Sequence, residues 1–293
     1  MFHTKPSSAD AVALSCAPTP ALGDDVRATA IHQRNFKVVE PANSARRRIT
    51  LDRSNAEPRE ELLVERTLQA FNTWSFKREQ PDNLVSLRQA IGRAVHLKEP
   101  VPFVLYWGKG PRRHIGKPEI ASLNYLGAFA DRIRRVYGAG AAIRLICTDT
   151  HADLNGHAPQ AIEDYFASLL TEAHARGFTD CRLSKLVRAV KDAEREEPDG
   201  GTDPDPATLQ RLSECAAKWY RGEGSASEGA IEYFRLNMVE KRAVELAFPH
   251  AIFVTFNGSE FRNLFPDNMP VFFMYSIKRG VSAKPWFLPD EIQ

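Results

Sequence analysis

The chain has 293 residues, of which 43% are hydrophobic and 26% are charged, and both fractions are typical of a folded globular protein. Its 39 basic and 37 acidic side chains leave a net charge of +2, a balance that favours neither a nucleic-acid-binding protein nor one that binds an anionic membrane. No apolar run approaches the roughly 20 residues of a membrane-spanning helix, and the four scattered cysteines form no C-x-x-C motif, which favours a reducing cytoplasm.

The first part of the chain, residues 1–57, carries Pro, Ser, Ala and Asp in mixed order without sustained hydrophobic periodicity, and is expected to be a mostly disordered tail. One domain is expected over residues 58–293, with a helical lead-in over 58–98 and a core over 99–290. Two amphipathic helices are expected in the lead-in, because apolar residues recur there at helical spacing. These residues are Val64, Leu68, Phe71 and Trp74, then Leu84, Leu87, Ile91 and Val95.

The core alternates β-prone apolar runs with amphipathic segments. Strands are expected over residues 101–107, 142–148, 250–256 and 271–275, with a weaker one over 181–187. Helices are expected around residues 123–136, 162–173, 207–221 and 228–247. Strands that alternate with helices predict an α/β fold, in which a mainly parallel sheet is flanked by helices on both faces.

A polar cluster follows each of four expected strands, and ligands of open α/β sheets bind beyond the carboxyl ends of the strands. We therefore expect these clusters to meet at one site for a small-molecule substrate. The candidate binding residues are Lys109, Arg112, Arg113, Asn155, Asn257, Ser259, Arg262, Lys284 and Trp286.

The cluster after the first strand is typical of an anion site. Gly108 and Gly110 allow the backbone to approach a ligand closely, and Lys109, Arg112 and Arg113 supply positive charge. The spacing does not match the phosphate-binding GxxxxGK[ST] motif, and a solvated basic turn explains the same residues equally well.

The cluster after the second strand offers two kinds of chemistry. Asp149 lies directly at the strand end, where a carboxylate can act as a base, although it can also cap the next helix. His151 and Asp153 also match part of a two-histidine, one-carboxylate iron or zinc site, which would indicate a metal-dependent oxygenase or hydrolase. The further histidine of such a site would be His157, His174 or His250.

The last two clusters carry hydrogen-bonding groups and an aromatic residue. Asn257, Ser259 and Arg262 can bind a carboxylate or phosphate, and Trp286 beside Lys284 either walls a pocket or packs on the sheet edge. In the preceding helix, Glu240 and Arg242 are interpreted as a surface pair in preference to part of a site. No GxSxG motif occurs and no GxGxxG follows a strand, which disfavours serine hydrolysis and hydride transfer on a dinucleotide fold.

The ordered set of segments resembles the isonitrile (isocyanide) synthase family, which includes the pyoverdine and dityrosine biosynthesis proteins. The resemblance extends over roughly residues 99–288. The similar stretches are Pro102–Gly110, Ala121–Ala141 (ASLNYLGAFADRIRRVYGAGA), Thr148-Asp149, Phe248–Ile252 and Lys284–Trp286.

The resemblance implies a Rossmann-like α/β fold and an enzyme of secondary metabolism. Such an enzyme converts the amino group of an amino acid, typically an aromatic one, into an isonitrile, takes the extra carbon from ribulose 5-phosphate and needs no metal. Lys109, with Arg112 or Arg113, would hold the sugar phosphate. Asp149 and His151 would move protons at the reacting centre, and Asn257 and Arg262 would fix the amino-acid carboxylate.

Several positions depart from the family pattern, so the chain would be a divergent member. Gly110 replaces the serine beside the family's lysine, Thr150 replaces the glycine after its aspartate, and Phe287 replaces a histidine after its Pro-Trp. The stretch 252–257 (IFVTFN) lacks the family's arginine and histidine. A non-catalytic ligand-binding protein that kept the fold is therefore a further interpretation.

Overall fold

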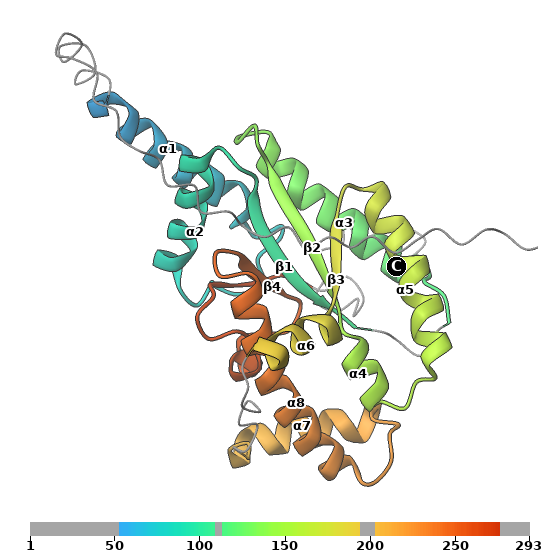
Figure 1. The fold of residues 1–293 in the computed structure, drawn as a ribbon. Helices are drawn as coiled ribbons and strands as arrows, with labels where there is room; N and C mark the ends of the chain where they lie inside the picture. The colour runs from blue at the N-terminus through green and yellow to red at the C-terminus, as the bar shows by residue number, and fades with distance from the viewer. Residues whose placement is uncertain (1–52, 109–112, 194–202, 276–293) are drawn as a thin grey trace, which may run out of the picture. The chain divides into compact units, whose positions relative to one another are not determined.

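The computed structural model describes residues 53–108, 113–193 and 203–275, which belong to a single α/β domain (Figure 1). The expected tail lies outside the described residues up to residue 52. Helix α1 (Arg53–Phe71) begins ahead of Pro58, where the domain was expected to start. No helix of the described part is long and apolar enough to cross a membrane.

Five parallel strands form the sheet, in the order β3-β2-β1-β4-β5, which confirms the expected fold class. The central strand β1 (Val101–Trp107) pairs with β2 (Ala141–Cys147) on one edge and with β4 (Ile252–Thr255) on the other. The outer strands are β3 (Thr179–Arg182) and β5 (Val271–Phe273). Helices cover both faces of the sheet, so β1, β4 and β5 are nearly continuous apolar runs, whereas the edge strand β3 is polar.

One face of the sheet, which we call the packed face, is covered by four helices: α1, α2 (Leu84–Leu97), α3 (Lys117–Arg134) and α5 (Pro159–Ala175). Its centre is a cluster of fully buried aromatic rings. The ring centroids of Phe103 and Phe129 lie 5.0 Å apart and those of Phe71 and Phe272 lie 5.2 Å apart, both in edge-to-face geometry.

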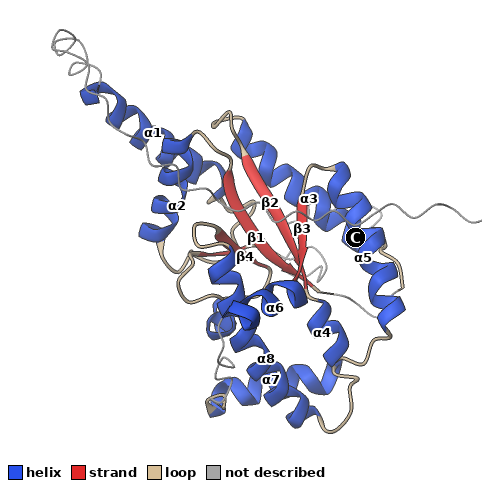
Figure 2. Cartoon of the chain, viewed as in Figure 1, coloured by secondary structure: helices blue, strands red, loops and turns tan. Residues whose placement is uncertain are grey.

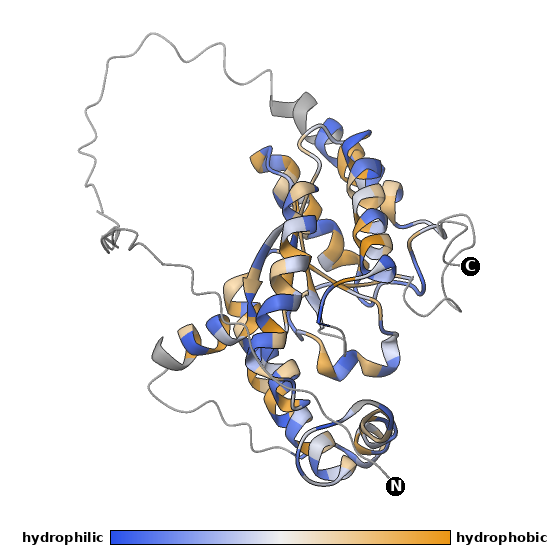
Figure 3. Cartoon of the chain, turned by 90° about the vertical axis from the view of Figure 1, so that its right-hand side faces the viewer, coloured by the Kyte–Doolittle hydropathy of each residue, from blue (hydrophilic) through white to orange (hydrophobic). Residues whose placement is uncertain are grey.

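The other face, which we call the cavity face, is covered by α6 (Leu183–Ala193), α7 (Pro206–Trp219), α8 (Ala226–Ala247) and the 3-10 helix η1 (Ser259–Leu264) (Figure 2). The short helix α4 (Asp149–Leu154) follows β2 directly. Hydrophobic and hydrophilic residues mix along each helix, as expected of helices that bury one side (Figure 3).

Two local expectations were wrong. The strand expected over residues 181–187 ends at Arg182, and Leu183 begins α6, because its partner β2 ends at Cys147 and offers no further pairing. Trp74 was expected on the buried stripe of the first helix. The helix ends at Phe71, and Trp74 is 68% exposed.

Candidate functional site

A cavity of about 530 Å³ lies at the carboxyl ends of β1, β2 and β4, between the sheet and helices α4, α7, α8 and η1. This is the edge of an open parallel sheet at which ligands bind. None of its described lining residues is Lys, Arg, Asp or Glu. Aromatic side chains dominate the walls, among them Tyr106, Trp107, Tyr233, Phe253, Phe261 and Phe265.

The polar centre of the cavity is a contact between α4 and α8. The His151 Nε2 atom lies 2.5 Å from Oε2 of Glu240, and the hydroxyl of Thr150 donates to Oε1 of the same carboxylate at 2.5 Å. Glu240 is 0% exposed, whereas the His151 side chain is 15% exposed and lines the cavity. The buried carboxylate therefore does not line the cavity itself, but it contacts His151, which does.

Helix α8 carries Glu240 and two residues of the cavity lining on one face. Tyr233, Asn237 and Glu240 are spaced four and three residues apart, which places them on one face of the helix.

Ser225 and Glu228 form a capping box at the start of α8: the Ser225 hydroxyl accepts from the Glu228 amide, and the Glu228 carboxylate accepts from the Ser225 amide.

Two buried polar atoms at the cavity have no hydrogen-bond partner among the described residues: the hydroxyl of Tyr106 and Oδ1 of Asn237. The ring of His151 packs against both tyrosines of the site, with centroids 6.1 Å from Tyr106 and 4.9 Å from Tyr233. Burial, and next the charge of Glu240, raises the pKa of both phenols, that of Tyr106 well above its usual value. Both phenols therefore stay protonated and able to donate at neutral pH.

Three of the residues predicted from the sequence lie at this cavity: His151, Asn155 and Asn257. The Asn155 side chain donates to the carbonyl of His151 at 2.7 Å, which ties the end of α4 back to its first turn. Asn257 follows β4, at the opposite wall. Their proximity supports the expectation that polar loops after separate strands meet at one place.

Asp149 does not line the cavity. Its carboxylate accepts from the Ser184 hydroxyl at 2.5 Å and from the Ser184 amide at 3.0 Å, so it joins the start of α4 to the start of α6. Of these two residues, only His151 lines the cavity. Both were expected at one reacting centre.

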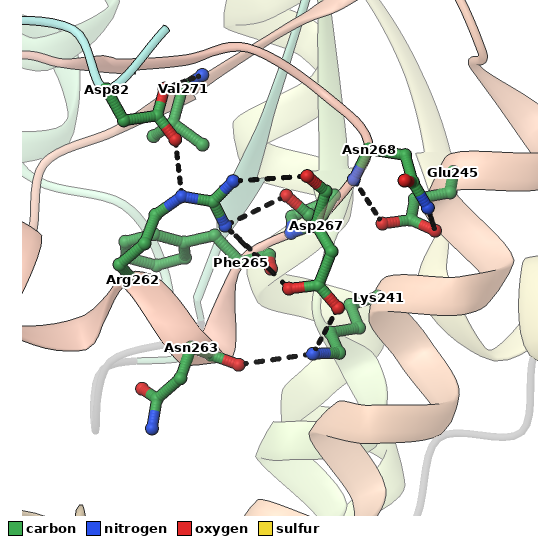
Figure 4. Close-up of polar contacts among 10 residues, drawn as sticks. Asp82, Lys241, Glu245, Arg262, Asn263, Phe265, Asp267, Asn268 and Val271 are labelled. Atoms are coloured by element: carbon green, nitrogen blue, oxygen red, sulfur yellow. Dashed lines mark hydrogen bonds and ion pairs between the residues drawn. The ribbon is translucent and has the colours of Figure 1, made fainter.

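Arg262 and Ser259 are also engaged away from the cavity lining. Arg262 binds Asp82 and donates to the carbonyl of Pro266 at 3.0 Å, and Asp82 accepts from the Val271 amide at 3.0 Å (Figure 4). The hydroxyl of Ser259 donates to Glu79 at 2.6 Å. These contacts attach η1 and β5 to the segment before α2.

Of the predicted anion site, the structure describes Gly108, which lines the cavity, and Arg113. Arg113 is exposed and its guanidinium lies 2.7 Å from the carboxylate of Asp164 on α5. Lys109, Arg112, Lys284 and Trp286 lie outside the described residues.

The alternative metal site receives no support from the geometry of the described residues. Within them, no group of three His, Cys, Asp or Glu side chains could hold a metal ion. Asp153 and His250 are exposed, and His174 pairs with Asp180 at 2.8 Å.

Glu240 is the residue whose importance the sequence analysis missed. A surface ion pair with Arg242 was expected, and this was wrong, because Glu240 is fully buried. The available signal was the helical spacing, since Glu240 falls in line with Tyr233 and Val244 on the buried side of α8.

Comparison with protein-family models and with curated proteins gave no match. Among solved structures, the chain is similar to the crystal structure of the PvcA protein from Pseudomonas aeruginosa, with a TM-score of 0.51 and 19% sequence identity. The similarity covers 73% of this chain and 84% of PvcA. At this identity it establishes a shared fold.

Proposed function

We propose that the protein is an enzyme of the isonitrile-synthase type, which converts the amino group of an amino acid into an isonitrile or a related product and uses a sugar phosphate such as ribulose 5-phosphate as the carbon donor. The observation that carries the proposal is the Glu240–His151 pair at an aromatic-lined cavity on the ligand-binding edge of the sheet. The fold is similar to that of PvcA, a pyoverdine/isonitrile synthase-family protein, and the sequence resembles the same family.

In the proposed reaction the substrate amine condenses with the sugar carbonyl with loss of water. Both carbon–carbon bonds of the former carbonyl carbon are then cleaved, so that this carbon stays on nitrogen as the isonitrile carbon and the rest of the sugar leaves as formaldehyde and a three-carbon phosphate. The amine must lose its proton before its nitrogen can attack, and His151 is the described lining residue suited to accept it. The aromatic walls would pack against the substrate side chain. Asn257 would bind the substrate carboxylate.

The phosphate of the sugar is assigned to Lys109, with Arg112. These residues follow Gly108 in the sequence, and Gly108 lines the cavity at the end of β1. Asp149 would act by fixing α4, and with it His151, through its bonds to Ser184.

The test is incubation of the purified protein with pooled amino acids and ¹³C-labelled ribulose 5-phosphate, followed by mass spectrometry. We expect one amino acid to be consumed and one labelled carbon to appear in its product. His151→Ala should lower turnover by about 10²-fold or more, the usual contribution of a general base. His174→Ala removes a surface histidine and should leave turnover unchanged.

Two outcomes would contradict the proposal. The first is the absence of both turnover and ribulose 5-phosphate binding. The second is binding of an amino acid without turnover under any condition, which would favour the non-catalytic ligand-binding protein instead.

A further inference from the structure

The Glu240 carboxylate has an unusual set of neighbours. It is 0% exposed, and among the described residues its partners are the Thr150 hydroxyl and the His151 ring, without a lysine or arginine in ion-pair contact. A buried carboxylate is costly unless hydrogen bonds compensate for its lost hydration. Both of its oxygens are compensated, one by each neighbour.

This arrangement fixes which nitrogen of His151 carries the proton. An ionised carboxylate can only accept hydrogen bonds, so Nε2 of His151 must donate to it. In a neutral imidazole the other nitrogen, Nδ1, then keeps its lone pair. Nδ1 has no hydrogen-bond partner in the described part of the chain, and His151 lines the cavity.

We infer that Glu240 is a positioning residue that holds His151 in the Nε2–H form. Nδ1 of His151 then accepts a hydrogen bond from an N–H or O–H group of the substrate in the cavity. The assignment of Nδ1 as an acceptor follows from the Nε2–Glu240 hydrogen bond when the carboxylate is ionised and the ring is neutral. Its role as the base that takes the amine proton rests on the proposed function.

The surroundings of His151 agree with a ligand that donates hydrogen bonds. Oδ1 of Asn237 is a second acceptor without a partner among the described residues, and Asn237 is 1% exposed. The Tyr106 hydroxyl can donate or accept. The rings of Tyr106 and Tyr233 flank His151 and favour a cation above their faces. A primary ammonium attached to an aromatic group has the N–H donors and the positive charge that these neighbours favour.

The tautomer is measured without substrate, by ¹⁵N NMR of the histidine rings at a pH where they are neutral. We expect His151 to show a protonated Nε2 and an unprotonated Nδ1. Glu240→Leu removes the acceptor and should let the ring populate both tautomers. Glu119→Gln alters a buried glutamate that caps α3 outside the cavity lining, and should leave the His151 signals unchanged.

A wild-type spectrum with the proton on Nδ1 would overturn the inference, whatever the fate of the variants. So would a Glu240→Leu protein that is folded and keeps a pure Nε2–H ring. Thr150→Val is the milder second variant, which removes a bond to the carboxylate but not the bond to His151. We expect it to keep the wild-type tautomer.

Two ligands test whether Nδ1 of His151 accepts a hydrogen bond from the ligand. They are protonated 2-phenylethylamine and its trimethylammonium analogue, which has the same charge but no N–H group. The amine should shift the Nδ1 resonance of His151, and the analogue should leave it at least tenfold less perturbed. Equal shifts, or none with the amine, would contradict an acceptor site. These spectra require no turnover, so they test the acceptor site even if the protein does not catalyse the isonitrile reaction.

The positioning role itself is read from kinetics. Glu240→Gln should lower kcat about 10²-fold with less than a threefold change in KM for the amine, because substrate binding is kept while the base is misplaced. A change confined to KM would show that Glu240 acts on binding alone and would refute the positioning role.

Discussion

Some buried polar groups in the helices on the two faces of the sheet have different kinds of partner. On the packed face, the hydroxyls of Thr67 and Ser122 bond to carbonyls four residues earlier in their own helices, at 2.7 and 2.8 Å. On the cavity face, Glu240 reaches across to α4, and the polar atoms of Asn237 and Tyr106 lack partners among the described residues. Locally satisfied polar groups stabilise the fold, whereas groups left open beside a cavity are available to a ligand.

The largest effect is expected from Phe129→Ala on the packed face. The Phe129 ring is fully buried and contacts the rings of Phe71, Phe76, Phe103 and Phe272. Its removal should lower the free energy of unfolding by about 3–5 kcal/mol, measured by denaturant titration. Phe261→Ala, at a ring that already lines the cavity, should cost less than half of that. Equal losses would show that the two faces do not differ in packing.

A smaller effect of opposite sign is expected from Asn237→Leu on the cavity face. The variant replaces a buried amide whose oxygen has no partner among the described residues, so it should raise the free energy of unfolding by about 1 kcal/mol. It should also weaken binding of 2-phenylethylamine. Thermal unfolding and ligand titration give the two values. Loss of stability without loss of binding would mean that Asn237 supports the fold and not the site.

The smallest effect concerns cysteine reactivity. Burial raises the pKa of the Cys147 thiol to about 12 and that of Cys181 to about 11. At pH 8 their thiolate fractions are then about 10⁻⁴ and 10⁻³, whereas Cys215 is exposed on α7 at the cavity. N-ethylmaleimide followed by peptide mass mapping should find Cys215 modified before Cys181 and Cys147. Rapid modification of Cys147 would indicate that the sheet opens.

Much of the fold follows from the sequence because burial on two sides leaves a strong pattern. The strand expected over residues 101–107 has the observed bounds of β1, and the helix expected over 228–247 begins at Ala226 and ends at Ala247 as α8. The exception is the segment 183–187, which is apolar enough for a strand. Its apolar residues Leu183, Leu186 and Val187 also recur at helical spacing, and the segment begins the amphipathic helix α6.

The site is less readable from the sequence. His151, Asn155 and Asn257 are found because loops after parallel strands converge at one edge. Arg262 and Ser259 satisfy the same rule, but Asp82 and Glu79 engage them, and those partners precede them by 180 residues in the sequence. Glu240 is missed for the converse reason: its partners lie on α4, and nothing in the local sequence of α8 reveals them.

The position of β1 in the middle of the sheet also bears on the order of folding. One edge of β1 is covered by β2, which follows soon after it, but the other edge waits for β4: Phe103 pairs with Ile252. During synthesis on the ribosome that edge stays open until the chain has grown past β4. The walls that β4 and η1 give to the cavity come from the same late segment, so the cavity is complete only after the chain has grown past η1.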